Sequence, residues 1–366
     1  MLKPICHIAC TPALRACRRL QEHLVAWLCD VNVGSADIVK VNLMPPRVPT
    51  QIEADWLWAF LQRELAGKPL LSRAQAVAAM SQADKEFLND WVAAVSNLEK
   101  QFQPNSPAWP IARPAIPDMS WQAFRELMEA FYEKGFRSGL PYAANGSPVT
   151  NGGVTYAQFV KEFRDTHRLN PNPGAREVCV LCGGELKDIE VDHWIAKSVY
   201  PLLSVCADNL LPICGECNCT DNKGTKAVHV QGSFSDWFHP YRRHANGNIR
   251  LNYDLQKRSI ISAPINPTDA AKVVNLDNLL NLSKRWTREF KAEYAKQQGV
   301  LLQRERRRIM RAQARHTQDE ILLHLQNVQG DLVSTEPHYE VHSILCIAML
   351  DQSRLAAWKA ELELVE

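Results

Sequence analysis

The sequence contains neither a long apolar run nor an excess of charge of one sign. None of its apolar stretches approaches the roughly 20 consecutive residues that a membrane-spanning helix needs. The apolar stretch at residues 5–9 is also shorter than that of a secretory signal peptide. We therefore expect an intracellular, cytoplasmic protein without membrane contact. Lysine and arginine number 42 against 40 aspartates and glutamates, so a surface for nucleic acid would have to be a local basic patch.

Other absences exclude further classes of protein. There is no internal repeat or low-complexity tract, and 46% hydrophobic with 22% charged residues is an ordinary globular composition, which excludes a fibrous or disordered chain. No glycine-rich phosphate loop is present, so we do not expect this chain to bind ATP. The 11 cysteines are an odd number and accompany no secretory signal, which argues against a disulfide framework.

Helical and β-like patterns alternate along the chain. Apolar residues recur at helical spacing over about residues 11–100, and five prolines then fall between positions 104 and 117. Ser120 is the expected N-cap of a helix, and residues 156–168 form another. Short β-like runs with turns occupy about residues 179–253, and long helices return after residue 269.

A chain of 366 residues should hold two or three structural units. We expect a mostly helical α+β protein with a small central domain that contains a metal site. The expected parts are a helical N-terminal region (1–116), a helical connecting region (117–174), the central domain (175–262) and a helical C-terminal region (263–366).

Two Cys-x-x-Cys pairs stand in the central domain, Cys179 with Cys182 and Cys214 with Cys217. Two residues between cysteines let one tight turn present both thiolates to a single ion, and two such turns complete a tetrahedral zinc site. Two glycines after the first pair permit the turn. A site with four thiolates has no open coordination position, so this Zn²⁺ would be structural, and chemistry has to be sought between the pairs.

Polar residues with catalytic potential lie between and beside the cysteine pairs. Residues 189–192 alternate apolar and acidic side chains, as in a strand with one buried face, and His193 follows directly. Residues 215–223 are expected to form a short helix that carries Asn218 and Asn222 four positions apart, on one side. Two strands and this helix could therefore direct a carboxylate, an imidazole and amides toward one point.

Asp192-His193, Asn209 and Asn218, in this order and inside the cysteine pairs, resemble the HNH endonucleases. The resemblance covers about residues 178–226, and it implies a ββα-metal fold, here in the variant braced by two zinc knuckles. Residues 191–226, with Lys197 and Tyr200-Pro201, and the later Phe238-His239-Pro240 and residues 276–285 carry a looser resemblance. They resemble the HNH subunits of bacterial anti-phage defence systems such as Septu. That resemblance implies an antiviral defence role with an ATPase or sensor protein as partner.

The HNH resemblance implies a role for each of these positions. His193 would be the general base, Asp192 and Asn218 would bind the catalytic divalent ion, and Asn209 would hold the loop that aims the histidine. Asn222 is a further candidate ligand. An imidazole with an ordinary pKa near 6.5 suits water activation at neutral pH, and carboxylate and amide oxygens favour Mg²⁺ or Mn²⁺.

Some charged residues have two possible readings. Glu190 is either an acceptor behind the ion ligands or a solvated strand residue, and Lys223 and Lys226 either contact phosphate or only water. Residues 284–315 contain 11 lysines and arginines against three glutamates, a local charge of +8. Four arginines of this run have the spacing of a helical stripe, which would bind phosphates, face solvent or bind an acidic protein: Arg304, Arg308, Arg311 and Arg315.

The expected function is therefore metal-dependent hydrolysis of phosphodiester bonds in nucleic acid, with double-stranded DNA as the expected substrate. The alternative is a non-catalytic nucleic-acid-binding or scaffold protein that keeps the zinc-braced fold. The sequence does not separate DNA from RNA, and it discloses neither cleavage specificity nor oligomeric state.

Overall fold

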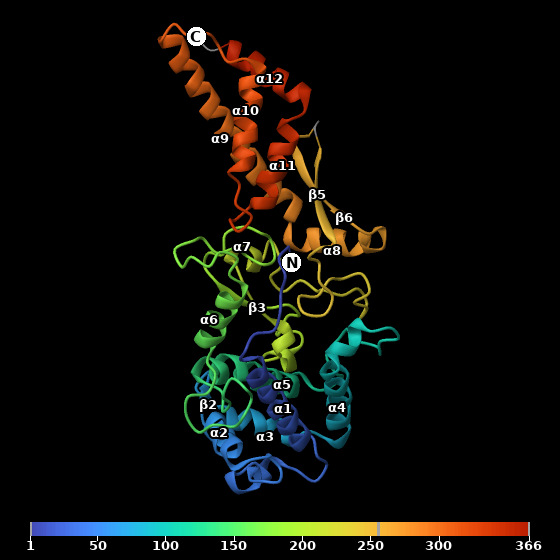
Figure 1. Ribbon diagram of the computed structural model, residues 1–366. Coiled ribbons are helices and arrows are strands. Elements are labelled where there is room, and N and C mark those ends of the chain that lie inside the picture. Colours follow the sequence, from blue (N-terminus) through green and yellow to red (C-terminus); the bar gives the residue numbers. More distant parts are fainter. Residues whose placement is uncertain (1, 255–256, 365–366) are drawn as a thin grey trace.

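The computed structural model describes residues 2–254 and 257–364. It is elongated, with the N-terminal helices at one end, a narrow arm of C-terminal helices at the other, and the central strands between them (Figure 1). Most of the chain is helical, and the strands of the described residues form three small two-stranded antiparallel sheets. This agrees with the expected α+β class. Within the same residues, no helix combines the length and apolar character needed to cross a membrane.

The N-terminal region is helical as predicted. Thr50 and Ser81 cap two of its helices, because their hydroxyls accept hydrogen bonds from backbone N–H groups three residues later. The elements of this region are α1 (Thr11–Leu28), α2 (Gln51–Leu61), β1 (Glu64–Leu65), β2 (Lys68–Pro69), α3 (Leu70–Ala78) and α4 (Gln82–Ser96).

The proline-rich stretch is not a free linker, because it packs against the central part. Trp109 is buried against Tyr200, whose hydroxyl donates to the carbonyl of Pro110 at 2.8 Å. The next helix, α5 (Asp118–Ala130), begins before the expected cap, so Ser120 lies in its first turn. This is a correction: Pro117 precedes the first turn and presets the backbone for helix entry.

Helix α5 continues into a π-helical turn, Phe131–Gly135, before the chain leaves the helix. Helix α6 (Tyr156–His167) agrees with the predicted run, and Thr155 caps it. Short 3₁₀ turns complete the described helices, at Ser35–Asp37, Lys40–Leu43, Leu98–Phe102, Phe136–Ser138, Pro201–Leu203, Ala207–Asn209 and Pro267–Asp269.

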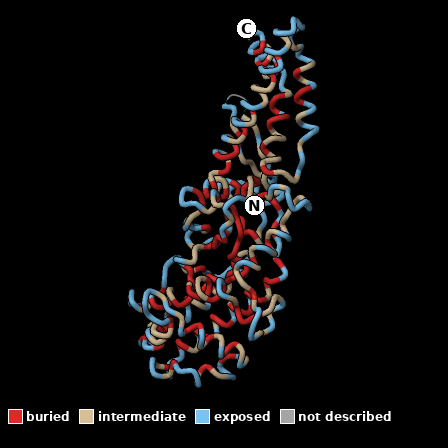
Figure 2. Tube along the Cα trace, turned by 90° about the vertical axis from the view of Figure 1, so that its left-hand side faces the viewer, coloured by how far each residue is buried: buried red, intermediate tan, exposed pale blue. Residues whose placement is uncertain are grey.

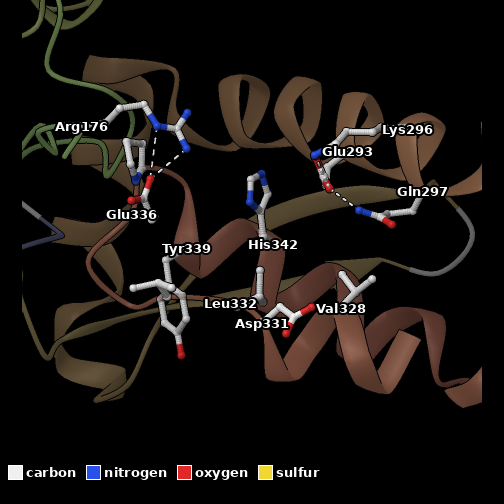
Figure 3. A pocket seen from close by; sticks show the side chains of 12 residues that line it. Arg176, Glu293, Lys296, Gln297, Val328, Asp331, Leu332, Glu336, Tyr339 and His342 are labelled. Atoms are coloured by element: carbon white, nitrogen blue, oxygen red, sulfur yellow. Dashed lines mark hydrogen bonds and ion pairs between the residues drawn. The ribbon is translucent and has the colours of Figure 1, made fainter. Parts of the chain in front are cut away.

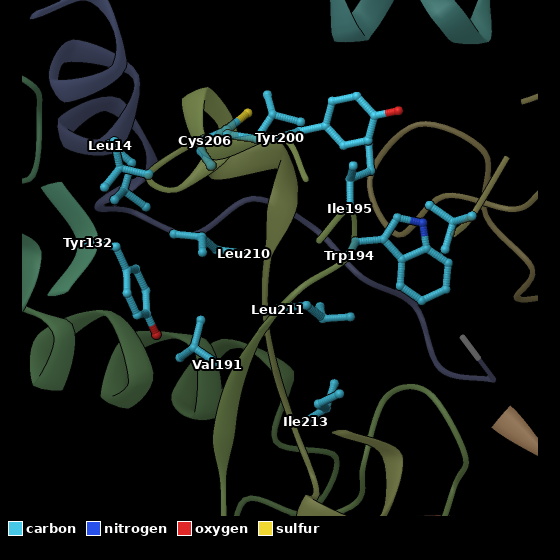
Figure 4. Packing of buried hydrophobic residues seen from close by; sticks show 14 of the residues in the cluster. Leu14, Tyr132, Val191, Trp194, Ile195, Tyr200, Cys206, Leu210, Leu211 and Ile213 are labelled. Carbon is cyan, nitrogen blue, oxygen red and sulfur yellow. The ribbon is translucent and has the colours of Figure 1, made fainter. Parts of the chain in front are cut away.

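The central hairpin pairs β3 (Glu190–His193) with β4 (Leu210–Ile213), and α7 (Gly215–Asn218) follows directly. The alternating pattern predicted one buried face, but Val191, Asp192 and His193 are all buried. The reason is visible in Figure 4, where Tyr132 lies on one side of the hairpin and Trp194 on the other. A strand covered on both faces buries its polar residues too, so these need partners inside the protein.

The C-terminal region forms the arm. Strands β5 (Ile249–Asp254) and β6 (Ser259–Pro264) pack against its helices, so the boundary expected after residue 262 falls inside a strand of the arm. The helices are α8 (Ala270–Leu280), α9 (Leu282–Met310), α10 (Gln318–Gly330), α11 (Tyr339–Met349) and α12 (Gln352–Glu363). Figure 2 shows buried residues gathered in the body and centre, and mixed exposure along the narrower arm.

Candidate functional site

The four paired cysteines converge on one point inside the protein. Their sulfur atoms all lie within 4.8 Å of one another, and all four residues are buried. The Sγ atoms of Cys179 and Cys217 are 4.0 Å apart, and those of Cys182 and Cys214 are 3.9 Å apart. Zinc–sulfur bonds of about 2.3 Å in a tetrahedron place sulfurs about 3.8 Å apart, so the cluster fits a metal ion such as zinc.

The turn after the first pair uses its two glycines for different reasons. Gly183 has a φ of +73°, in the left-handed region that favours glycine. Gly184 leaves no room for a side chain, because a Cβ there would lie 2.9 Å from the ring of His338. The N–H of Gly184 also donates to the sulfur of Cys182 at 3.4 Å. The turn therefore favours glycine at Gly183 through its backbone and at Gly184 through the close approach of His338.

Distant parts of the chain dock onto this cluster. Three carbonyls at positions 181–183 accept hydrogen bonds from the N–H of Leu2 at 3.2 Å, the indole of Trp286 at 2.9 Å and the N–H of His338 at 2.7 Å. The guanidinium of Arg285 donates to the sulfur of Cys217 at 3.3 Å. The cysteine cluster is thus where the start of the chain, α9 and α11 meet.

His193, at the end of β3, is buried with its ring orientation set by one hydrogen bond. Its Nε2 lies 2.9 Å from the carbonyl oxygen of Ser204, so Nε2 carries the proton and Nδ1 keeps its lone pair. The edge of the ring packs against Tyr132 at a centroid distance of 4.6 Å. Burial, assisted by the positive charge of Lys197, lowers the pKa of His193 to about 3. The imidazole is therefore neutral at physiological pH, with a lone pair on Nδ1.

Asn209 holds the loop between the two strands, as the sequence resemblance implied. The residue is fully buried. Its side-chain oxygen accepts from the N–H of Ile195 at 2.6 Å, and its amide donates to the carbonyls of Ile195 at 2.9 Å and Leu203 at 3.2 Å. Because Leu203 precedes Ser204, this amide holds the backbone next to the carbonyl that orients His193.

The N-terminal helices brace the same loop. The hydroxyl of Ser204 donates to the carbonyl of Met128, in α5, at 2.6 Å and accepts from the amide of Gln21, in α1, at 3.2 Å. No local sequence pattern predicts either contact, because Gln21 and Met128 lie in ordinary amphipathic helices. The orientation of His193 therefore depends on residues more than 60 positions away.

Asp192 and Lys223 form a buried ion pair, which corrects the expectation that Lys223 is a surface residue. The Lys223 Nζ lies 3.1 Å from Oδ1 and 3.0 Å from Oδ2 of Asp192, and it donates to the carbonyl of His193 at 2.8 Å. Its side chain is 0% exposed. Burial raises the pKa of Asp192, and the ammonium of Lys223 opposes that rise. A buried carboxylate needs such a partner, so Lys223 neutralises Asp192 from inside the fold.

Asn218 and Asn222 do not share a helix face, because α7 ends at Asn218. Asn218 is partly exposed, and its amide donates to the carboxylate of Glu190. Asn222 is buried and turned away, with its amide 2.6 Å from the carbonyl of Glu216 and its oxygen accepting from Asn281 at 2.8 Å. The chain is diverted by turns after Asn218, so Asn222 joins the central part to the arm.

One open cavity of about 550 Å³ collects the candidate residues. Its lining includes His193, Asp192, Asn218 and Glu190, but not Asn209, Asn222 or Lys223, which lie behind it. Tyr132, Glu133, Arg137, Tyr156 and Lys197 also line it, and sequence reasoning assigned none of them a role at the site. Lys226 is exposed next to this lining, with its ammonium 2.7 Å from the carbonyl of Asp221.

The predicted arginine stripe is not one helical stripe, because α9 ends at Met310. Ala312 takes a φ of +54°, and the chain reverses toward α10, so Arg311 and Arg315 lie in the connection. Arg304 contacts the ring of His324 at 3.0 Å, and Arg308 forms an ion pair with Glu320, both in α10. Arg315 donates to the carbonyl of Leu362 at 2.8 Å. Three of the four arginines therefore join parts of the arm to one another.

The arm also contains a cavity of about 330 Å³, between α9 and α11 (Figure 3). Four of its charged residues form two ion pairs, Arg176 with Glu336 at 2.8 Å and Lys296 with Glu293 at 3.0 Å. It holds no unpaired cluster comparable with that around His193.

Comparison with known proteins found no match for the chain among family models, curated proteins or solved structures.

Proposed function

We propose that the protein is a metal-dependent endonuclease of the HNH type, which hydrolyses phosphodiester bonds in nucleic acid, with double-stranded DNA as the expected substrate. The observation that carries the proposal is the meeting of His193, whose Nδ1 keeps its lone pair, with Asp192 and Asn218 in the lining of one open cavity. These groups are a base and hard oxygen ligands, which are the two requirements of phosphodiester hydrolysis.

His193 would act as the general base. Its Nε2–H is held by the Ser204 carbonyl, which leaves Nδ1 to take a proton from water. The depressed pKa keeps the ring neutral at physiological pH, so no proton has to be lost before the reaction. Asn209 would act through the loop and not on the substrate, because it is fully buried behind the strand.

The donor set beside His193 fits a hard divalent ion. Asp192 and Glu190 leave β3 on the same side, because side chains alternate along a strand, and Asn218 contacts Glu190. The amide oxygen of Asn218 and the two carboxylates are the types of ligand that Mg²⁺ and Mn²⁺ prefer. Such an ion, when bound, would supply positive charge that stabilises the scissile phosphate and the departing oxygen.

An antiviral role with an ATPase or sensor partner is the wider setting that the sequence resemblance suggests for this activity. The rival function is a non-catalytic nucleic-acid-binding or scaffold protein. The structure favours the enzyme through one feature: a scaffold has no need of a buried histidine with a free ring nitrogen at the edge of an open cavity.

The decisive experiment is a cleavage assay on purified protein with plasmid, single-stranded DNA and RNA, in Mg²⁺, in Mn²⁺ and in a weak chelator that leaves tightly held zinc in place. We expect cleavage that requires the divalent ion and disappears in His193→Ala. Zinc content and circular dichroism are measured for both proteins. Absence of cleavage by folded, zinc-loaded wild-type protein on all three substrates would support the scaffold instead.

A further inference from the structure

The wall of the cavity nearest His193 comes from parts of the chain outside the hairpin. The π-helical turn Phe131–Gly135 supplies Tyr132 and Glu133, and Arg137 follows directly after it. Lys197 comes from the loop after β3. π-Helical turns inserted in α-helices are frequent at functional sites, because the extra residue redirects the side chains that follow.

The ring of Tyr132 connects His193 to both cations. The Tyr132 ring and the imidazole meet at a steep angle with their centroids 4.6 Å apart, and the ammonium of Lys197 lies 4.5 Å from the Tyr132 centroid. The guanidinium of Arg137 lies 5.7 Å from the Tyr132 ring and 5.4 Å from the Tyr156 ring. Contact with ring faces orients the guanidinium, and its five N–H donors outnumber its partners in the protein, Glu133 and Tyr132, so some donors stay available for a ligand.

The two cations share a carboxylate and still have donors to spare. Both pair with Glu133, Arg137 through Nε at 3.4 Å and Lys197 through Nζ. The carboxylate of Glu129 also attracts Lys197. The Arg137 side chain is 56% exposed, and a guanidinium has five donors, so most of its hydrogen-bonding capacity faces the cavity and solvent.

We propose that Arg137 and Lys197 bind phosphates of the nucleic-acid substrate next to the scissile bond, and that Tyr132 is a positioning residue that holds both cations beside His193. The inference deepens the proposed function, since it names how the same cavity recognises its substrate. The proposal requires negative charge on one side of the cavity and positive charge on the other, and the lining residues provide both. Glu190 and Asp192 leave β3 on one side to hold a cation, and His193 leaves on the other, toward the two cations that would hold anions.

The test measures binding in the His193→Ala background, where cleavage does not interfere. Affinity for a duplex and for a single-stranded oligonucleotide is measured over a range of salt, with no divalent ion added. Arg137→Gln and Lys197→Gln should each bind roughly three- to tenfold more weakly and lower the magnitude of the log–log salt slope by about 0.9 on duplex DNA. Arg137→Lys should retain the slope, because the charge remains.

The matched control is Arg113→Gln, which removes an equally simple charge pair, with Asp118, outside the cavity lining. It should leave affinity and slope unchanged. In the cleaving protein, Arg137→Gln should raise KM with little change in kcat, since the contact would be made before and during the reaction.

Two results would overturn the inference. One is that Arg137→Gln and Lys197→Gln give the same salt slope as Arg113→Gln, whether or not their melting temperatures fall. The two cations would then be structural. The other is no nucleic-acid binding by the His193→Ala protein. Failure of the proposed function is a separate result. It would appear as absence of metal-dependent cleavage by wild-type protein, which the binding measurements do not test.

Discussion

The cysteine cluster and His193 lie at opposite ends of the β3–β4 hairpin, and the cluster and the cavity around His193 are built in different ways. Cys214 follows β4 directly at the end where Glu190 pairs with Ile213, whereas His193 pairs with Leu210 at the other end. The cluster is closed and buried, and the cavity is open and charged. One end is suited to holding the fold together, and the other to meeting a ligand.

Remote parts of the chain contact both ends, but these contacts do different things at each end. At the cluster, remote residues such as Leu2 and Trp286 donate to a turn that its own cysteines and glycines already define. At the cavity, remote residues define the site itself, because Met128 and Gln21 hold the loop that orients His193. We therefore expect changes at the cluster to affect folding, and changes at the cavity to affect chemistry.

The largest effect should come from the cluster. Cys179→Ser removes one thiolate, and structural zinc can contribute on the order of 10 kcal/mol, comparable with the stability of a whole domain. We expect loss of bound zinc and rapid proteolysis of the central part, measured by metal analysis and limited trypsin digestion. Cys219→Ser, an exposed cysteine outside the cluster, is the control and should behave as wild type. Folded Cys179→Ser protein with normal protease resistance would contradict this view of the cluster.

At the cavity end, His193→Ala should reduce cleavage by about 10²–10⁴-fold, the usual contribution of a general base. The fold should survive with a smaller cost of about 1–3 kcal/mol, because the Ser204 carbonyl loses its donor. Single-turnover rates and urea unfolding measure the two effects separately. More than a tenth of the wild-type rate in this variant would remove His193 from its assigned role.

The next effect should come from the buried ion pair of Asp192 and Lys223, and it should appear in the free energy of unfolding. Lys223→Met leaves Asp192 buried without its counter-charge, so we expect a loss of about 3–5 kcal/mol in the free energy of unfolding. The double variant Lys223→Met with Asp192→Asn should regain much of that loss, because no unpaired charge remains. Denaturant unfolding of the two variants decides this, and equal stability of single and double variants would show that the pair is not coupled.

The smallest effect should come from the arm, remote from both ends. Helix α9 rises about 1.5 Å per residue, so Arg308 lies roughly 35 Å along it from Arg285 at the cluster. Arg308→Gln breaks a partly exposed pair with Glu320, and we expect a loss of at most about 1 kcal/mol and unchanged zinc content. A reduced salt slope for DNA binding in this variant would instead assign the arm to nucleic acid, as the basic run first indicated.

Several features were predictable from sequence because their determinants are local. Cys-x-x-Cys spacing needs only one turn per pair, and the structure brings all four sulfurs together. The order Asp192, His193, Asn209 and Asn218 placed three residues at the cavity and one in the loop behind it. The N-terminal and C-terminal helices followed from apolar periodicity.

The errors share a physical cause, which is that tertiary packing overrides a local pattern. Alternation in residues 189–192 indicated one buried face, but Tyr132 and Trp194 cover both. The helix expected over 215–223 ends at Asn218, and Asn222 instead binds Asn281. The spacing of the four arginines assumed a helix that ends at Met310, where α10 folds back to pair with Arg308.

The sequence by itself determined the cysteine cluster, the identity of the groups beside it and the helical character of the flanks, because spacing, ligand type and periodicity act over a few residues. Only the tertiary structure decided which groups face the cavity. Burial turned Lys223 from an expected surface cation into the partner of Asp192, and it oriented His193 through α1 and α5. It also brought Arg137 and Tyr132 to the same cavity, since contacts between residues some 60 positions apart depend on the packing of whole helices.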